Sequence, residues 1–340
     1  MMNNSFKIIF LAVALFLSGC SNTNKNVLTE LTGTTMGTSY SIKIVSTNNF
    51  DKTLLQSSID SVLENVNLQM STYIPESEIS IFNSSMDTTW HKISSDFASV
   101  LLESIKLGKL SNGTLDITIE PIVNLWGFGP EDRPRQIPDK KLIAERLRFI
   151  GLDKIKVEIT DTSSRIKKSI PELKLDLSST AKGFGVDKIF RFLSNNGFHN
   201  YMVEIGGEVR TKGRNAENKN WQIGISTPDK SGAVEKVLPL KNLAMATSGS
   251  YWNYFEENGK RFSHTINPLT GRPITHNLVS VTVIAPSCLL ADGAATAINV
   301  LGPDKGLQFA EKLNLAAYLI VRNENGYKII TSKNFNKLFN

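Results

Sequence analysis

The sequence predicts an α+β domain in which a largely antiparallel or mixed β-sheet forms the core and helices lie outside it. Stretches of alternating polar and apolar residues, typical of half-buried strands, are interleaved irregularly with stretches whose apolar residues recur every three or four positions, typical of one helix face. The chain has 340 residues and neither an internal repeat nor a low-complexity tract. It is therefore long enough for one large domain or two closely packed ones.

The expected strands come from short runs of alternating or β-branched residues bounded by polar and glycine-rich segments. They are residues 40–45, 173–177, 201–210, 221–226 and 279–285. The pair Gly206-Gly207 breaks the third of these runs and marks a turn within it.

The expected helices have an apolar face and recognisable ends. They are residues 54–70, 96–110, 138–149 and 181–195. A cluster of Ser94, Ser95 and Asp96 caps the second helix, because short polar side chains accept hydrogen bonds from the free N–H groups of a first turn. Pro138 is expected in the first turn of the third helix, and Gly151 lies just beyond its end.

The chain begins like a secretory signal peptide, predicted over residues 1–19. Lys7 is its only charged residue, and ten apolar residues follow from Ile8 to Leu17. Ten residues span about 15 Å as a helix, roughly half of a bilayer core, so this segment is too short for a stable membrane anchor. We expect it to be removed on export.

Leu17-Ser18-Gly19-Cys20 resembles the bacterial lipobox, in which the cysteine is lipidated and becomes the first residue of the mature protein. The alternative is an ordinary signal peptide in which Cys20 has no role. Several acyl chains on Cys20 would give durable attachment to membrane lipid. We expect residues 20–28 to form a tether, residues 29–340 to form the enzyme domain, and the protein to face the periplasm from a membrane of the cell envelope.

Composition excludes several classes of protein. Cys288 is the only cysteine left after Cys20, so no intramolecular disulfide is available to the mature domain. The formal net charge of +6 is spread along the chain and no nucleic-acid-binding motif accompanies it. We expect no nucleic-acid partner.

Two clusters in the first half of the chain carry residues suited to a binding site. A glycine- and threonine-rich turn at residues 33–38 precedes the first strand. The second cluster contains Asp116 between apolar strand residues and continues into Leu125-Trp126-Gly127-Phe128-Gly129. Asp116 must either find hydrogen-bond partners or lie at the mouth of a site. Taken alone, a turn aspartate is the simpler interpretation.

A third cluster, residues 176–183, runs from the end of an expected strand into the start of a helix. Backbone N–H groups at such a helix start can bind a phosphate, and Lys182 can add a positive charge. Asp and Ser residues also cap helices that bind nothing.

Two further clusters lie near the C-terminus. Residues 246–251 lead to His264, one of four histidines, and to a turn rich in proline and glycine. His264 is a candidate base, although a histidine beside a turn is more often structural. Asp292 and Thr296 are four residues apart and share one face if the segment is helical. Their hard oxygen donors suit magnesium or calcium, but a capping Asp with a buried Thr is an equal alternative.

Taken together and in this order, the five clusters resemble the ApbE family of FAD:protein FMN transferases over nearly all of the mature chain. The resemblance also includes Ser71-Thr72-Tyr73 with Ser77-Glu78 and the residues from His264 to Pro273. It implies an ApbE-like fold with FAD in a cleft between two closely packed lobes. It also implies transfer of the FMN moiety of FAD to a Ser or Thr hydroxyl of an exported client flavoprotein, with release of AMP.

The resemblance assigns the remaining roles residue by residue. The residues expected around FAD are Met36, Tyr73, Thr114, Leu115, Asp116, Asp176, Lys182 and Ile266. The expected magnesium ligands are Ser179, through its backbone carbonyl, and the side chains of Asp292 and Thr296. His264 is the expected general base. The implied clients are flavoproteins of membrane electron-transport complexes.

Three positions depart from the family pattern: Leu115 stands where an aromatic residue is usual, Asn267 replaces an Asp, and Thr180 is unusual in its segment. Two other functions fit the same residues. One is an FAD pyrophosphatase that yields FMN and AMP, and the other is a lipid-anchored FAD-binding protein without catalysis.

The lipobox hypothesis predicts that Cys20→Ala prevents lipidation, because no thiol remains to accept the lipid. Fractionation should then find precursor or soluble protein, while a variant beginning near Asn22 stays active in solution. A Cys20→Ala protein that loses residues 1–19 and still remains on the membrane would contradict the hypothesis.

Overall fold

The computed structural model describes residues 26–229, 233–250 and 253–339. The predicted signal peptide and Cys20 lie outside these residues. Strand β1 begins at Val27, so the last two residues of the expected tether already belong to the sheet. In the described residues, no helix is long and apolar enough to cross a membrane.

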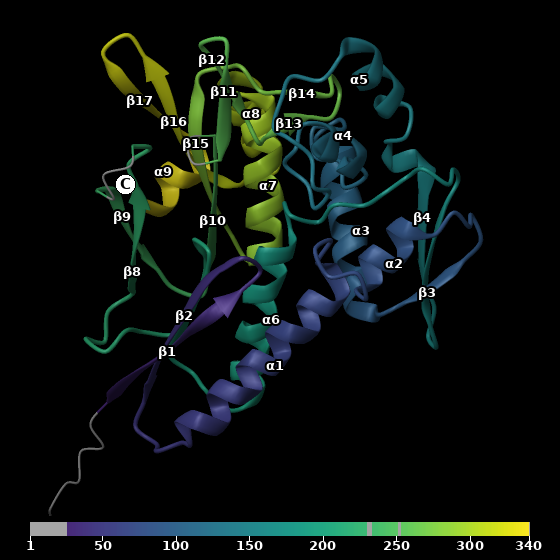
Figure 1. Ribbon diagram of the computed structural model, residues 1–340. Coiled ribbons are helices and arrows are strands. Elements are labelled where there is room, and N and C mark those ends of the chain that lie inside the picture. The colour runs from purple at the N-terminus through teal and green to yellow at the C-terminus, as the bar shows by residue number, and fades with distance from the viewer. Residues whose placement is uncertain (1–25, 230–232, 251–252, 340) are drawn as a thin grey trace, which may run out of the picture.

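The largest sheet contains eight strands of the described chain, in the order β1-β2-β6-β7-β10-β15-β16-β17, and each pair of neighbours is antiparallel (Figure 1). Their bounds are β1 Val27–Thr35, β2 Thr38–Ser46, β6 Tyr201–Ile205, β7 Glu208–Lys212, β10 Ala244–Gly249, β15 Leu278–Ala285, β16 Ala316–Asn323 and β17 Gly326–Thr331. All eight residues of β15 are buried, as expected for a strand covered on both faces.

Helices cover one face of this sheet, and a hairpin with a short helix covers the other. Along β10, Ala244 and Ala246 pack toward α6 (Ala181–Asn195) and α7 (Cys288–Leu301), whereas Met245 packs with β8 (Trp221–Ser226), β9 (Val234–Leu240) and α9 (Lys333–Phe339). This alternation is the period of two that a strand between two apolar layers requires. Helix α8, Pro303–Lys312, adds to the layer formed by α7.

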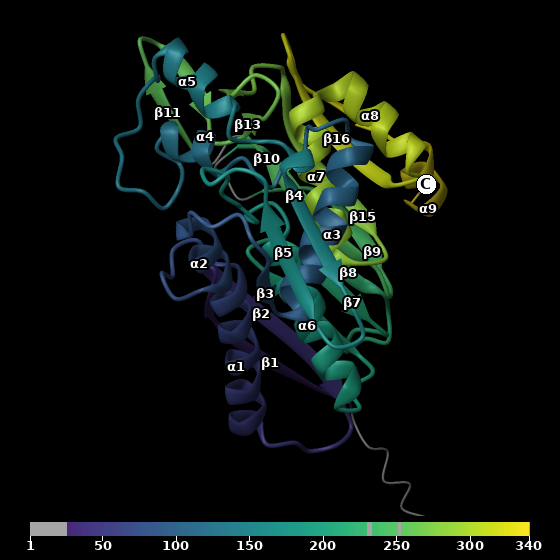
Figure 2. The same ribbon diagram turned by 90° about the vertical axis from the view of Figure 1, so that its right-hand side faces the viewer.

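A second lobe packs beside these helices (Figure 2). Its three-stranded sheet has the order β3-β5-β4, with bounds His91–Ile93, Ser164–Lys168 and Ile155–Ile159. Helices α1 Lys52–Met70, α2 Glu78–Ser84 and α3 Ser95–Leu110 connect it to the larger sheet. The remaining short elements are α4 Glu120–Leu125, α5 Lys140–Leu147, the 3₁₀ turn Leu152–Lys154, the hairpin β11 Tyr254–Glu257 with β12 Lys260–Ser263, and the pair β13 Ile266–Asn267 with β14 Arg272–Pro273.

The α+β prediction is confirmed, and most predicted elements lie within two residues of their observed bounds. Ser94 caps α3 by accepting a hydrogen bond from the N–H of Phe97. The position expected for Pro138 was wrong, since Asp139 is the N-cap of α5 and Pro138 precedes it. The first turn of the chain was also misplaced: residues 33–35 belong to β1, and Met36 and Gly37 make the turn to β2.

The strand predicted over residues 173–177 is absent from the structure. Lys174 makes an isolated parallel bridge with Ile119, and the N–H of Asp176 donates to the carbonyl of Ile117, but no continuous ladder forms. Asn83 takes the place of a neighbouring strand: its side-chain amide donates to the carbonyl of Leu175 at 2.8 Å and accepts from the N–H of Leu175 at 2.7 Å. The alternating leucines of this segment are buried, but the side chain of Asn83 satisfies the backbone groups of Leu175 that a ladder would have paired. Asp116 and Asp176 consequently do not adjoin strands.

The close approach of α6 to α7 depends on Gly183. A Cβ at this position would lie 2.5 Å from the carbonyl oxygen of Cys288 and 2.8 Å from the Cβ of Asp292. Both obstacles belong to or adjoin the backbone, so they cannot move without shifting α7. Any larger residue would separate the two helices.

We therefore expect Gly183→Ala to lower the free energy of unfolding by about 1–3 kcal/mol, as for other overpacked sites. Alanine favours a helix interior by about 1 kcal/mol over glycine, so propensity alone predicts the opposite sign. Gly185→Ala is the matched control, because its Cβ would first meet the flexible end of Met36, at 2.8 Å. Urea denaturation measures both variants, and equal stability for the two would contradict this account.

Candidate active site

The N-termini of α6 and α7 meet in the centre of the molecule, where the two helices form one column (Figure 1). Asp187 of α6 accepts hydrogen bonds from the backbone N–H groups of Cys288 and Leu289, at 3.0 and 3.1 Å. Asp292 of α7 accepts one from the N–H of Gly183, at 2.9 Å. Each helix thus supplies a carboxylate to the N-terminus of the other. The positive ends of two helix dipoles face one region, which favours anions there.

A buried cluster of charges adjoins this junction. Lys182 of α6 lies 3.5 Å from a carboxylate oxygen of Glu208, at the start of β7, and also interacts with Asp292. Burial raises the pKa of Glu208 and of Asp292, and the charge of Lys182 opposes that rise in both. Two carboxylates share one ammonium group, and the second oxygen of Glu208 makes no hydrogen bond with any described residue.

Two of the three predicted magnesium ligands lie on α7, at or next to this cluster. Asp292 and Thr296 are one turn apart on α7. Thr180, at the start of α6, packs on the same helix: a Cβ on Gly293 would come within 3.1 Å of its methyl group. Ser179 directly precedes Thr180 in the chain. Magnesium binds such hard oxygen donors and completes its shell with phosphate or water.

These residues fit a magnesium ion. In the described part of the chain, no three His, Cys, Asp or Glu side chains gather as a metal site. Asp292 and Thr296 supply one carboxylate and one neutral oxygen, and a bound pyrophosphate would supply further negative oxygens.

On the other side of the junction, the segment containing Asp116 runs beside the segment containing Asp176. The N–H of Asp176 donates to the carbonyl of Ile117 at 2.8 Å. Asp116 accepts from both the N–H and the hydroxyl of Thr118, at 2.8 and 2.6 Å. It is therefore a turn aspartate, as the simpler interpretation held, and burial raises the pKa of its carboxyl group despite these bonds.

Tyr73 lies close enough to Asp176 for the carboxylate to affect its phenol. Partial loss of hydration and the negative charge of Asp176 raise the pKa of Tyr73, while the positive charge of Arg135 opposes them. The Tyr73 side chain is 70% exposed, so an aromatic surface remains free for a ligand.

His264 is held in one tautomer by Asn253. The carbonyl oxygen of Asn253 lies 2.9 Å from Nδ1 of His264 and also accepts its backbone N–H at 3.0 Å. A carbonyl can only accept, so Nδ1 carries the proton and Nε2 keeps a free lone pair. Burial lowers the pKa of His264, and the charges of Lys182 and Arg135 lower it further, so the ring is neutral near pH 7.

Aromatic residues support the His264 loop. The indole N–H of Trp126 donates to the carbonyl of Gly271 at 2.8 Å, and the ring stacks on Phe262 at a centroid distance of 5.8 Å. The edge of Phe128 faces His264 at 6.4 Å. The Leu-Trp-Gly-Phe-Gly segment thus positions the histidine.

The chain matches a known protein family over most of its length. The family model described as "ApbE family" matches residues 36–319. The chain belongs to the ApbE family. It is 48% identical to the FAD:protein FMN transferase of Haemophilus influenzae, over 97% of this chain and 96% of the relative, and 42% identical to that of Vibrio cholerae, over 96% and 97%.

Solved structures of ApbE proteins have the same fold. The flavin transferase ApbE from Vibrio cholerae superposes with a TM-score of 0.84 at 40% identity, covering 92% of this chain and all of that one. The apo form of the flavinyl transferase ApbE from Pseudomonas stutzeri gives 0.85 at 35% identity, covering 93% and 98%.

Four of the residues expected around FAD are not presented to the cluster as exposed side chains. Leu115 is 3% exposed in the core between α3 and α7, and Ile266 is 4% exposed beside Trp126. Thr114 donates its hydroxyl to the carbonyl of Ser111 and lines a separate cavity of about 460 Å³. Met36, in the β1–β2 turn, is half-buried against Gly185. Leu115 and Ile266 could contact FAD only through their backbones.

Two of the departures from the ApbE pattern have structural consequences. Asn267 accepts the N–H of Leu269 at 2.9 Å, the same turn bond that an aspartate would make. The hydroxyl of Thr180 accepts a hydrogen bond from Ser104 at 3.2 Å, which ties α6 to α3. Neither substitution disrupts the site.

Sequence reasoning missed several charged residues of this ApbE site. Asp187 and Glu208 were not singled out, although the glycine pair directly before Glu208 was a usable signal. Arg135 was also missed, as was Glu120, which is buried and whose pKa burial raises to about 7. No motif marked these two, because their role depends on segments distant in sequence.

Lys182→Met should lower the free energy of unfolding by about 3–5 kcal/mol near pH 8, since it leaves the buried carboxyl groups of Glu208 and Asp292 without a cationic partner. Carboxyl groups whose folded pKa is raised destabilise the fold above that pKa, so the loss should shrink as pH falls and they protonate. Lys106→Met, which removes an exposed partner of Glu103, is the control and should cost less than about 1 kcal/mol. A loss in Lys182→Met that is independent of pH would contradict the buried cluster.

Proposed function

We propose that the chain is an FAD:protein FMN transferase that moves the FMN moiety of FAD onto a Ser or Thr hydroxyl of an exported client flavoprotein. The facing N-termini of α6 and α7, with Asp292 and Thr296 beside them, are the observation that carries this proposal. The positive ends of the two helices and the ammonium group of Lys182 favour an anion, and the oxygen donors beside them suit magnesium, which supports a dinucleotide pyrophosphate as the ligand. The curated relatives bear the name of this enzyme.

In the proposed reaction, the client hydroxyl oxygen attacks the FMN-side phosphorus of FAD. A new P–O bond forms, and the bond from this phosphorus to the bridging oxygen breaks. The electron pair leaves with AMP, and the hydroxyl proton goes to a base. Because little covalent chemistry falls to the protein, its contribution is position and charge.

Named residues of this chain would position the reactants and stabilise the charge that develops on the phosphates. Lys182, at the start of α6, would hold the pyrophosphate, and Asp292, Thr296 and the carbonyl of Ser179 would hold magnesium. When bound, magnesium would neutralise charge on the phosphates and the leaving group. Tyr73 with Asp176 would orient the flavin or ribose, and Asp116 would support that side of the cleft.

His264 would accept the proton of the client hydroxyl at Nε2. The hydrogen bond to Asn253 leaves that atom unprotonated, and the lowered pKa keeps the ring neutral. Arg135 and Lys182 oppose a second proton on the ring. His264 is therefore poised to take a proton only while the hydroxyl is attacking.

We also propose, from the lipobox and the apolar run before it, that the mature protein is lipid-anchored through Cys20 and faces the periplasm. Its clients would be exported flavoproteins of membrane electron-transport complexes, which share that location.

A flavin-transfer assay distinguishes this function from the two alternatives, an FAD pyrophosphatase and an FAD-binding protein without catalysis. Metal-loaded protein is incubated with FAD, with and without a client, and the client is analysed for covalent flavin fluorescence and mass. Labelled client supports transfer. AMP released without a client identifies a pyrophosphatase, and retention of intact FAD in both cases identifies a binding protein.

Asp292→Ala should abolish transfer, and excess magnesium should restore it poorly, because the variant loses the one charged ligand. Thr296→Ala should be milder, since a neutral ligand contributes less charge. Binding of Mn²⁺ measured by electron paramagnetic resonance provides a readout independent of turnover. If the Asp292→Ala variant turns over FAD at the rate of the parent protein and with the same metal dependence, Asp292 is not a magnesium ligand.

His264→Ala should keep FAD affinity nearly intact and lower the transfer rate by roughly 10²- to 10⁴-fold, the usual loss for a general base. A lowered pKa predicts that the parental rate rises with pH through an inflection below the ordinary histidine value of about 6.5, and that the variant lacks this inflection. If the variant retains it, the base lies elsewhere.

A further inference from the structure

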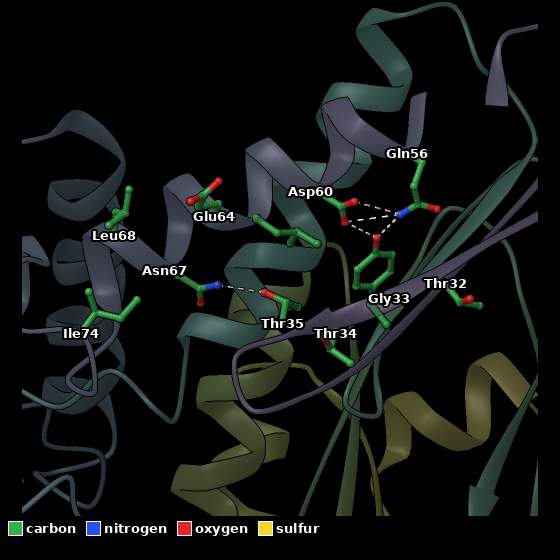
Figure 3. Close-up of a pocket in the computed structure, with 12 residues that line it drawn as sticks. Thr32, Gly33, Thr34, Thr35, Gln56, Asp60, Glu64, Asn67, Leu68 and Ile74 are labelled. Carbon is green, nitrogen blue, oxygen red and sulfur yellow. Dashed lines mark hydrogen bonds between the residues drawn. The ribbon is translucent and has the colours of Figure 1, made fainter. Parts of the chain in front are cut away.

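A cavity of about 640 Å³ lies outside the site discussed above, between α1 and the β1–β2 hairpin (Figure 3). Its floor is formed by residues 32–35 of β1. Its roof carries polar side chains of α1, among them Asp60, Glu64 and Asn67. The groove ends at Ile74, the residue after Tyr73.

The floor of this groove is the free edge of the sheet, since β1 is the first strand in the sheet order and pairs only with β2. Thr34 is opposite Ser39, whose carbonyl accepts from Gly206 on the far side of β2. In an antiparallel pair, residues whose backbone N–H and C=O groups bond to the facing strand alternate with residues whose N–H and C=O groups point away from it. Thr34 and Thr32 therefore direct their backbone N–H and C=O groups outward, toward the groove.

Gly33 keeps the groove open between these two residues. A Cβ at Gly33 would lie 2.6 Å from the ring of Tyr40, which crosses beneath the groove to reach Asp60. Figure 3 shows α1 above the strand, with Asp60 close to the hydroxyl group of Tyr40 and Glu64 one turn further along the helix. A groove with two carboxylates in its roof favours a ligand with a cationic side chain.

We propose that this groove binds an extended segment of the client protein as an added strand on β1, with a lysine or arginine beneath Asp60 and Glu64. The outward backbone groups of Thr32 and Thr34 provide the ladder hydrogen bonds that such an added strand needs. The inference rests on the proposed transfer of FMN to a protein.

Continuity with the active site supports a client over any other occupant. Thr35, at one end of the groove floor, precedes Met36, and Asn67 of the roof donates to the Thr35 hydroxyl at 3.1 Å. Ile74 follows Tyr73 at the same end. A strand that follows β1 in this groove therefore leads its acceptor hydroxyl toward the proposed flavin contacts.

Thr34→Pro tests the backbone pairing. Proline removes an outward N–H but no bond to β2, so it should raise the client KM by about three- to tenfold, the effect of one lost hydrogen bond. Leu28→Pro is the matched control, because Leu28 has the same outward register in β1 and lies outside the groove. FAD affinity should be unchanged in both.

Glu64→Lys tests the charge and leaves the strand intact. Two synthetic peptides share a central Thr and differ in flanking residues, which are lysine in one and glutamate in the other. The parent should bind the lysine peptide about three- to fivefold more tightly, and Glu64→Lys should lose this preference. Glu324→Lys, the same charge change in the turn between β16 and β17 at the opposite edge of the sheet, should retain it.

Hydrogen exchange on the parent gives a third test that needs no variant. The amides of Thr32 and Thr34 should gain protection when the lysine peptide is added, and those of Leu28 and Glu30 should not. Absence of this protection, or equal binding of the two peptides, overturns the groove proposal. If the parent labels a client while these tests fail, only the groove proposal is wrong; if it labels no client, the transfer function is wrong.

Discussion

The reciprocal bonds between two helix N-termini are the constraint on which the rest of the structure depends. Asp187 satisfies N–H groups of α7, and Asp292 satisfies one of α6. Without these carboxylates, the positive ends of two helix dipoles would repel at close range and leave buried donors unpaired. With them, one carboxylate of the pair also stands at the edge of the anion site. The same residue therefore contributes to the fold and to the proposed chemistry.

The large sheet places turns from distant parts of the chain around that junction. Gly206 in the β6–β7 turn has no room for a side chain, because a Cβ would lie 2.7 Å from Thr38 and 3.4 Å from Lys182. Glu208 follows directly and pairs with Lys182. The antiparallel order of β2, β6 and β7 thus brings the first hairpin, the glycine pair and the start of α6 together.

The bounds of most helices and strands could be predicted from the sequence, because they depend on residues within the element itself. The bounds of α6 and β8 follow from their own periodicity, and Ser94 marks the start of α3. The strand expected at residues 173–177 failed because its partner is the side chain of Asn83, about ninety residues away, as its hydrogen bonds to Leu175 show. Asp187 and Arg135 were missed for the same reason: their importance arises from contacts that no local pattern encodes.

The most direct test of the account is a crystal structure of the protein with FAD and Mn²⁺ in place of magnesium. Anomalous diffraction locates manganese without reference to the protein density. The account predicts one peak bound by the carboxylate of Asp292 and the hydroxyl of Thr296, with the FAD pyrophosphate at the start of α6. A peak elsewhere, for example between Glu120 and Glu131, with the pyrophosphate away from both helix N-termini, would contradict it.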